Sequence, residues 1–304
     1  MMNFADDKPL NRILNGLFVP YAQRVPDVKA VSSAMKNLGL ISKQEDIIND
    51  HIAFRTLGIP NLGISSFERI FLHHGYIKQD HYFFPKKKLD AYWYKPPHDR
   101  YPRVFISELK VESLSKQAQK VIHHYTNSIQ EDPLNRVDLD NVDDVVSFFY
   151  RALWELPRLS DYNALLSESE YGAWVLYNRY YLNHYTISVH ELPAPYNKLK
   201  SFNKFLKSIG IKLNDAGGEI KISQDHLLLQ SSTVSQSIQA TFANGETAEI
   251  AGSYVEFAER LPLPQFTNLP KEKLTNSERR DGFETGNADK IFESTFLEQI
   301  NKHS

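Results

Sequence analysis

One short stretch of the sequence combines a possible metal ligand with a possible anion-binding side chain. From Asp50 to Gly58 the residues alternate in polarity, which predicts a β-strand with His51 and Arg55 on one face. At about 3.3 Å per residue the two lie roughly 13 Å apart along the backbone, and the long arginine side chain can lean back over much of that gap. A small dicarboxylate could then contact a metal on His51 with one end and Arg55 with the other. A hydrogen-bonded core histidine and a peripheral arginine are the simpler interpretation of this stretch taken alone.

Two further stretches offer ligands that could join His51. The alternating run 183–190 predicts a strand that carries His184, and the run 252–258 predicts one that carries Glu256. A carboxylate on the inner face of an aromatic-flanked strand is costly unless it is paired or bound to a metal. Two neutral imidazoles and one carboxylate form the ligand set that holds Fe(II) and leaves positions open for substrate and O₂. The three side chains therefore predict a non-heme iron site.

Other residues compete for a place in this site. His190 shares the inner face of its strand but lies near the strand end. Glu108 could be a fourth metal ligand, yet its neighbour Ser107 points to the opposite face, and only one of them can line the site. We favour Ser107 as the residue that lines the pocket and binds substrate. Arg279 and Arg280 could close over an anionic ligand, although a salt-bridged surface turn is the simpler interpretation. Seven other histidines are expected at helix ends, strand starts or loops: His73, His74, His81, His98, His123, His124 and His226.

The elements that would position these residues form two similar units. Each unit consists of a strand, a helix and three further strands, over 50–110 and over 181–260. In the second unit, 237–244 and 248–258 are expected to pair as a hairpin with its turn at Asn244-Gly245. Two such βαβββ modules side by side form a half-open barrel whose inner strands aim side chains at its centre.

Helical additions are expected around the two modules. Residues 9–48 carry helical periodicity and predict an N-terminal cap, and 111–180 predict a helical insertion between the modules. The extension 261–304 begins irregularly because of its prolines. We therefore expect a single catalytic domain over 1–304 with an α+β fold.

Composition limits the classes of function. The 304 residues are 41% hydrophobic, enough for a large core, and a formal net charge of −2 gives no basic excess for nucleic acid or an anionic membrane. The absence of cysteine excludes disulfides, thiolate metal sites and cysteine nucleophiles. No apolar run of about 18 residues and no signal-peptide pattern is present, so a cytoplasmic protein is expected. The sequence does not fix the oligomeric state.

Four motifs resemble those of a known family when taken in order. They lie at 51–56, 104–109, 183–186 and 254–260. Together they resemble the motifs of the 2-oxoadipate dioxygenase/decarboxylase family, which belongs to the vicinal oxygen chelate (glyoxalase) superfamily. The resemblance covers the chain from about residue 10 to about residue 300.

The resemblance implies both a ligand set and a reaction. It implies Fe(II) held by His51, His184 and Glu256, with Arg55 holding a substrate carboxylate. It also implies that 2-oxoadipate, or a similar 2-oxo acid, reacts with O₂ to give 2-hydroxyglutarate and CO₂, as a step of lysine degradation. Two alternatives stay open. One is a glyoxalase-type isomerase or lyase, which would need a fourth ligand such as Glu108, and the other is a protein that binds a small acid without turnover.

Overall fold

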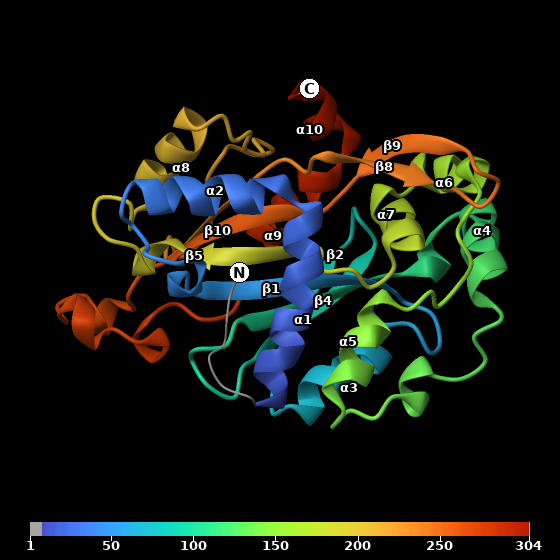
Figure 1. Cartoon of the computed structure of the whole chain (residues 1–304), viewed down its shortest axis with the longest axis horizontal. Coiled ribbons are helices and arrows are strands. Elements are labelled where there is room, and N and C mark those ends of the chain that lie inside the picture. Colours follow the sequence, from blue (N-terminus) through green and yellow to red (C-terminus); the bar gives the residue numbers. More distant parts are fainter. Residues whose placement is uncertain (1–7, 304) are drawn as a thin grey trace.

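An eight-stranded mixed sheet forms the centre of the protein (Figure 1). The computed structural model describes residues 8–303. Along the sheet the strands lie in the order β2-β3-β4-β1-β5-β10-β7-β6. The first half of the chain contributes β1 (Asn49–Leu57), β2 (Ile77–Phe84), β3 (Leu89–Lys95) and β4 (Arg103–Leu109). The second half contributes β5 (His184–Ser188), β6 (Lys221–Ile222), β7 (Leu228–Ser232) and β10 (Tyr254–Arg260).

Both halves of the sheet have the predicted βαβββ order. A helix follows the first strand of each half: α3 (Ile64–His73) follows β1, and α8 (Leu199–Ser208) follows β5. Each first strand pairs in parallel with the last strand of its own half, and β1 pairs with β5 in antiparallel orientation. The two first strands therefore lie side by side in the middle of the sheet. The predicted α+β architecture of two modules is confirmed.

The prediction of one hairpin over 237–244 and 248–258 was wrong in its second arm. β8 (Ser237–Thr241) pairs with β9 (Thr247–Ala251) in a separate two-stranded sheet. β9 ends before Gly252, whose N–H donates to Gln236 O at 3.1 Å. The chain then returns to the central sheet as β10. Only Gly252 and Ser253 separate the two strands, and this short interruption was not recognised as a break. The strand that carries Glu256 is thus separate from the hairpin.

Helices occupy the stretches where periodicity predicted a cap and an insertion. The cap contains α1 (Pro9–Arg24) and α2 (Pro26–Asn37), and each begins with a proline, whose missing N–H costs no helical hydrogen bond at that position. The insertion contains α4 (Lys116–Thr126), α5 (Val142–Tyr150), α6 (Leu159–Leu166) and α7 (Glu170–Asn178). The C-terminal extension contains α9 (Thr285–Ile291) and α10 (Leu297–Lys302).

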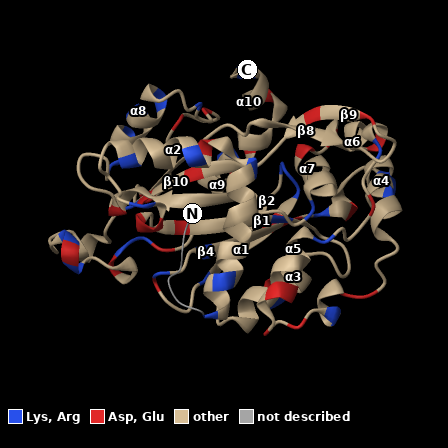
Figure 2. Cartoon of the chain, viewed as in Figure 1, with Lys and Arg blue, Asp and Glu red and all other residues tan. Residues whose placement is uncertain are grey.

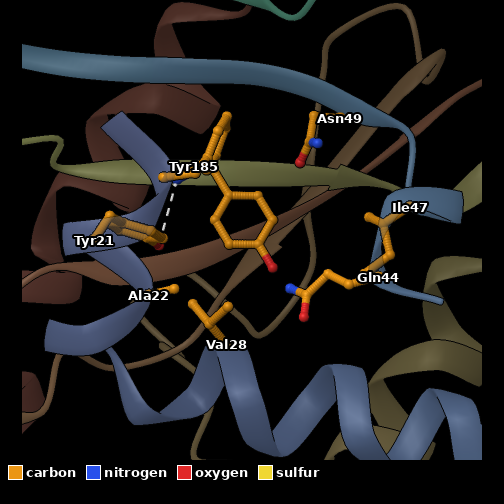
Figure 3. A pocket seen from close by; sticks show the side chains of 8 residues that line it. Tyr21, Ala22, Val28, Gln44, Ile47, Asn49 and Tyr185 are labelled. Atoms are coloured by element: carbon orange, nitrogen blue, oxygen red, sulfur yellow. Dashed lines mark hydrogen bonds between the residues drawn. The ribbon is translucent and has the colours of Figure 1, made fainter. Parts of the chain in front are cut away.

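Different parts of the chain cover the two faces of the sheet. On one face Phe18 and Tyr21 of α1 pack edge-on against Tyr185 of β5, with ring centroids 5.6 and 5.4 Å away. Between α1, α2 and β5 a gap of about 10 Å³ remains (Figure 3), room for about one water molecule. On the other face, Phe292 of the C-terminal extension shares the wall of a cavity with His184, the strand neighbour of Tyr185. Alternation along β5 therefore aims the predicted ligand at the second face.

Charges are spread over the outside of the molecule. Figure 2 shows basic and acidic residues interspersed along helices and loops in that view, in keeping with the net charge of −2. Among residues 8–303, no helix is long and apolar enough to cross a membrane.

The carboxylate of Glu108 belongs to the start of α3. It accepts a hydrogen bond from Ile64 N at 2.7 Å, where the N-cap residue Gly63 has no side chain to do so. A Cβ at Gly63 would lie 2.5 Å from Glu108 Oε2, so the glycine makes room for this cap. Burial raises the pKa of Glu108. Glu108 therefore lies on the face of β4 that carries α3, and Ser107 lies on the other face, as predicted.

We expect Glu108→Ala to lower the free energy of unfolding by about 1 kcal/mol, as for loss of a helix cap. Metal binding should not change, because the carboxylate faces α3. Denaturant unfolding and metal titration measure the two quantities, with the exposed Glu112→Ala as the matched control. A variant that unfolded normally but lost metal would instead support Glu108 as a fourth ligand.

Candidate metal centre

Three neighbouring strands bring two histidines and a glutamate together. His51 comes from β1, His184 from β5 and Glu256 from β10, and all three side chains are buried. The two Nε2 atoms lie 3.4 Å apart. Glu256 Oε2 lies 3.5 Å from Nε2 of His51 and 3.1 Å from Nε2 of His184. The three residues predicted from sequence thus converge on one point and form a group that could hold a metal ion.

The spacing of the three atoms fits a shared cation. Ligand atoms about 2.1 Å from one metal are about 3.0 Å apart at right angles and about 3.4 Å apart at tetrahedral angles. The observed separations run from 3.1 to 3.5 Å. One ion can therefore be bound by all three atoms with little movement. Three ligands on one side leave its other side open.

Hydrogen bonds on the far side of each ring fix the imidazole tautomers. His51 Nδ1 lies 2.8 Å from Asp50 Oδ1, and His184 Nδ1 lies 3.0 Å from Asn183 Oδ1. Because these oxygens accept, Nδ1 carries the hydrogen in both rings, and each Nε2 turns a lone pair toward the centre. Two lone pairs at 3.4 Å cannot bond to each other, and a cation satisfies both.

Burial and charge set the protonation of the three groups. Burial lowers the pKa of His184 to about 4, against the pull of Glu256, so this imidazole is neutral. Burial acts the same way on His51, but Glu256 and Asp50 outweigh it and raise the pKa of His51 above its ordinary value. Burial would raise the pKa of Glu256, yet the two imidazoles hold it at about 2. The carboxylate is therefore ionised, and the neutral His184 presents a free lone pair to a metal.

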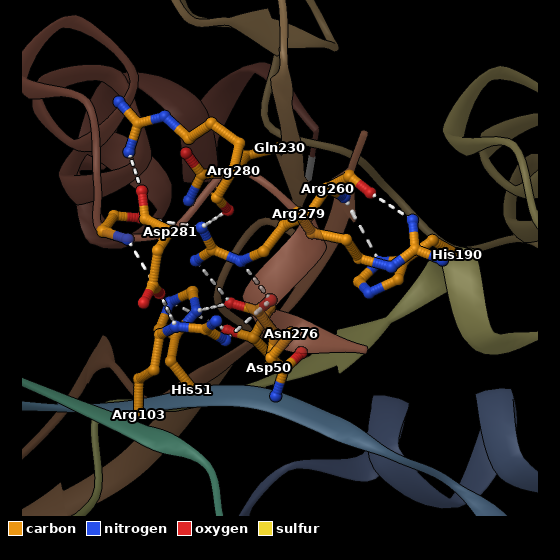
Figure 4. Close-up of polar contacts among 12 residues, drawn as sticks. Asp50, His51, Arg103, His190, Gln230, Arg260, Asn276, Arg279, Arg280 and Asp281 are labelled. Atoms are coloured by element: carbon orange, nitrogen blue, oxygen red, sulfur yellow. Dashed lines mark hydrogen bonds and ion pairs between the residues drawn. The ribbon is translucent and has the colours of Figure 1, made fainter. Parts of the chain in front are cut away.

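A buried ion pair holds Asp50 behind His51 (Figure 4). Arg260 at the end of β10 donates from Nε to Asp50 Oδ2 at 2.6 Å and from Nη2 to Oδ1 at 2.9 Å. Arg103 of β4 adds a contact at 3.7 Å. Burial raises the pKa of Asp50, but Arg260 outweighs it and holds this pKa well below its usual range. The pairing of β1 with β5 is irregular between Asn49 and Ile52, where its register shifts. Such an irregularity changes the direction of the side chains in that stretch, which includes Asp50 and His51.

A second pair of residues holds Glu256. Gln230 of β7 donates from Nε2 to Glu256 Oε1 at 2.7 Å, and Asn287 of α9 donates to Gln230 Oε1 at 3.0 Å. Oε2 is left to face the histidines. Sequence reasoning named neither Gln230 nor Asn287, and it assigned no role to Asp50 or the motif residue Arg260. For Arg260 the available signal was its position within a motif that also carries a ligand, and for Asp50 it was its position directly before such a motif.

His190, Arg279 and Arg280 lie outside the metal-ligand group. His190 lies in a 3₁₀ turn after β5, where its Nδ1 accepts from Arg260 N at 3.2 Å. Arg279 donates from Nη1 to Arg260 O at 2.9 Å, and Arg280 lies 3.2 Å from Asp225 Oδ2. Arg280 thus belongs to a salt-bridged turn, whereas Arg279 is buried against the end of β10 and does not lie on the surface. Phe283 follows this turn and packs edge-on against His51, with centroids 4.8 Å apart.

Arg55 is a buried cation on the same strand as His51. Its Nη1 donates to Thr295 Oγ1 at 2.9 Å and its Nη2 to Phe292 O at 3.2 Å, while its Nε has no partner. Within residues 8–303, no carboxylate lies at ion-pair distance from Arg55. Burial lowers the pKa of Arg55, but an arginine stays charged. Three rings flank the guanidinium at 5.1 to 5.7 Å: Tyr171, Trp174 and Phe292. Since a buried charge is costly without a counter-ion, this position suits an anionic ligand.

Ser107 lies beside Arg55, because the two residues are partners in the β1–β4 register. Its Oγ lies 2.8 Å from Tyr171 Oη and donates to Phe54 O at 3.2 Å. The structure thus places Ser107 on the face of the sheet that carries the metal ligands. Contact between Ser107 and substrate stays a prediction.

A small cavity of about 20 Å³ adjoins the metal ligands. That volume holds about one water molecule. Its apolar wall comes largely from the C-terminal extension, which contributes Phe283, Ala288, Ile291 and Phe292, and Phe105 of β4 completes it. The extension therefore covers the site.

Comparison with solved structures identifies the class of fold. A glyoxalase superfamily protein from Ralstonia eutropha has a similar structure, with a TM-score of 0.70 and 21% identity over 90% of this chain and 85% of that chain. This likeness concerns the fold alone, and it confirms the expected vicinal oxygen chelate architecture. Residues 13–271 match the model of the 2-oxoadipate dioxygenase/decarboxylase family, and the chain belongs to this family.

Relatives at higher identity carry the same description. The chain is 44% identical over 303 residues to the chloroplastic 2-oxoadipate dioxygenase/decarboxylase of Arabidopsis thaliana, covering 96% of this chain and 79% of the relative. It is 41% identical to the chloroplastic/amyloplastic enzyme of Oryza sativa subsp. japonica, over 98% and 82% of the two chains. A crystal structure of the hydroxyglutarate synthase from Oryza sativa, in complex with 2-oxoadipate, has a TM-score of 0.87 at 41% identity and covers 96% and 94%. These names give no support to a cytoplasmic location.

Loss of one of the three ligands should abolish tight metal binding. We expect His51→Ala, His184→Ala and Glu256→Gln each to weaken affinity more than the roughly 10- to 100-fold that changes in outer-shell partners cause. Anaerobic titration against a chelator measures this, with the exposed His124→Ala as control. Unchanged affinity in any ligand variant would remove that residue from the centre.

Asp50→Asn should weaken metal binding about 10- to 100-fold, because the amide lacks the charge and the second acceptor oxygen that hold it against Arg260, and His51 is then oriented less firmly. Asp281→Asn is the matched control: Asp281 also accepts from Arg103, at 2.6 Å, but touches no predicted ligand. The same chelator titration compares the two variants. An equal loss in both would point to a general effect of charge rather than to orientation of His51.

Proposed function

We propose that this protein is an Fe(II)-dependent dioxygenase that decarboxylates a 2-oxo diacid. 2-Oxoadipate is the first candidate, with 2-hydroxyglutarate and CO₂ as products. One observation carries the proposal: Arg55, a buried cation with no carboxylate at ion-pair distance in the described part of the chain, lies on the strand that provides His51 to the metal centre. The names of the relatives and the 2-oxoadipate bound to the rice protein support the same substrate.

The three ligands are proposed to hold iron. His51 and His184 would offer neutral nitrogens and Glu256 a carboxylate oxygen, a donor set that suits Fe(II) and leaves positions open for other ligands. Bound iron would supply the redox chemistry that joins O₂ to a 2-oxo acid. The chain itself keeps both histidines in the metal-binding tautomer through Asp50 and Asn183.

Arg55 is proposed to hold the substrate carboxylate that is remote from the metal. The planar guanidinium can donate two parallel hydrogen bonds to a carboxylate, which lysine cannot match. Ser107 is proposed to help bind the substrate beside it, since its hydroxyl can exchange a present partner for a substrate oxygen. The diacid would thus be held at both ends, and its carbon chain would have a fixed position relative to the metal.

The apolar cover is proposed to keep water out. Phe105, Phe283 and Phe292 line the cavity next to the ligands. Removal of water strengthens each electrostatic contact and limits side reactions. Since the cavity of about 20 Å³ cannot contain a six-carbon diacid, the substrate has to displace part of the cover as it enters.

Two alternatives have less support. A glyoxalase-type isomerase would use a fourth ligand, but Glu108 faces α3. Nothing in the site favours a protein that binds an acid without turnover. We further propose that residues 1–304 act as one catalytic unit, within lysine degradation, on the small acid and O₂. A cytoplasmic location stays a prediction.

Oxygen uptake tests the reaction. Protein loaded with Fe(II) without air should consume about one O₂ per 2-oxoadipate and release 2-hydroxyglutarate, while a Zn(II)-loaded sample should consume none. Uptake with another 2-oxo acid only would keep the reaction and change the substrate. Iron-loaded protein that consumes no O₂ with any 2-oxo acid would overturn the proposal.

Substitutions of Arg55 should impair turnover of the substrate and leave iron binding unchanged. We expect Arg55→Lys to lower kcat/KM for 2-oxoadipate about 10- to 100-fold, because it keeps the charge and loses the fork, and Arg55→Ala to lower it further. Steady-state O₂ uptake measures kcat/KM, and iron content is measured on the same samples. Loss of iron in Arg55→Lys would count against the assigned role.

A further inference from the structure

Tyr254 places a buried hydroxyl without a partner at the wall of the site. It lies two residues before Glu256 on β10, so both side chains face the same way. Its ring lines the cavity and lies 4.7 Å from the ring of His184. Tyr254 is fully buried, and its hydroxyl has no hydrogen-bond partner among residues 8–303.

The sheet register places Tyr254 between the metal centre and Arg55. Ala53 of β1 is level with His184, and His184 is level with Tyr254. Ala53 lies halfway along the strand from His51 to Arg55. Burial raises the pKa of the Tyr254 hydroxyl, and the Arg55 guanidinium is the first group that opposes this rise. The register therefore places the hydroxyl near the cation, and the two groups interact electrostatically.

Each of these two neighbours lacks a partner. The hydroxyl of Tyr254 is unsatisfied, and so is the Nε atom of Arg55. Buried polar groups without partners are uncommon because each costs desolvation free energy, and a missing ligand is one explanation. A carboxylate between the two could accept from both.

We propose that the Tyr254 hydroxyl donates a hydrogen bond to the substrate carboxylate that Arg55 binds, and that this contact selects a 2-oxo diacid over a 2-oxo monoacid. The inference rests on the proposed function and adds to it a residue that determines specificity. A monoacid would leave the Tyr254 hydroxyl and the Arg55 Nε buried without a substrate oxygen to bond, and the Arg55 charge without a carboxylate. Sites built to bond a polar group reject analogues that lack it far more strongly than apolar pockets reject a missing methylene.

Tyr254→Phe removes only the hydroxyl, and Tyr185→Phe is its matched control. Tyr185 lies on the neighbouring strand β5, its hydroxyl is also buried and without a partner, and it points to the other face, into the gap beneath α1 and α2 (Figure 3). The two variants therefore make the same chemical change on opposite sides of one sheet. Thermal unfolding and iron content check that both are intact.

The experiment compares 2-oxoadipate with 2-oxohexanoate, which has the same chain length and no second carboxylate. Tyr254→Phe should lower kcat/KM for 2-oxoadipate about 10- to 100-fold, mainly through KM, as for loss of one hydrogen bond to a charged group. It should leave kcat/KM for 2-oxohexanoate nearly unchanged, so the preference for the diacid falls. Tyr185→Phe should change neither value.

Two results would overturn the inference. Equal losses on both acids would place the hydroxyl at the metal end or give it a structural role, and no loss on either would mean that it does not touch substrate. Calorimetric binding of both acids to Fe(II)-loaded protein without O₂ repeats the comparison independently of turnover. If wild type binds 2-oxoadipate without consuming O₂, the proposed function fails and the binding data still test Tyr254. If wild type binds neither acid, both proposals fail.

Discussion

The site depends on one buried ion pair between the two modules. Asp50, on the first strand of the first module, is bonded through both oxygens to Arg260, on the last strand of the second, and through one of them to His51. Arg260 also donates from Nη1 to Arg280 O at 3.0 Å and to Gly282 O at 2.7 Å. Burying such a pair costs desolvation that its attraction only partly offsets. Its contribution lies in geometry, because it fixes the ring of a metal ligand and the turn that covers it.

The residues that face the site could be predicted from sequence because strands alternate with a period of two. That period put His51 with Arg55, and Ser107 opposite Glu108, without knowledge of the fold. The convergence of three strands required more, namely the recurrence of the strand-helix-strand order in the chain. The antiparallel pairing of β1 with β5 then brings the first strands of the modules together.

The supporting contacts could not be predicted, because they join residues far apart in sequence. Asp50 and Arg260 are 210 positions apart, and Arg55 and Thr295 are 240 apart. No local pattern records such a pair. The hairpin was misjudged for a related reason: a strand that ends at Ala251 and one that begins at Tyr254 look continuous, and only their partners in space separate them.

The C-terminal extension links closure of the site to the charge inside it. Thr295 Oγ1 and Phe292 O are the acceptors that now satisfy Arg55, and both belong to the extension. A carboxylate that binds the guanidinium has to share or replace these neutral acceptors, and charge-assisted hydrogen bonds are the stronger ones. The same extension reaches the opposite end of the site through Asn287 and Gln230 to Glu256. Under the proposed function, entry of a diacid would exchange contacts of the cover with Arg55 for contacts of substrate, while the contacts behind the metal ligands could stay in place.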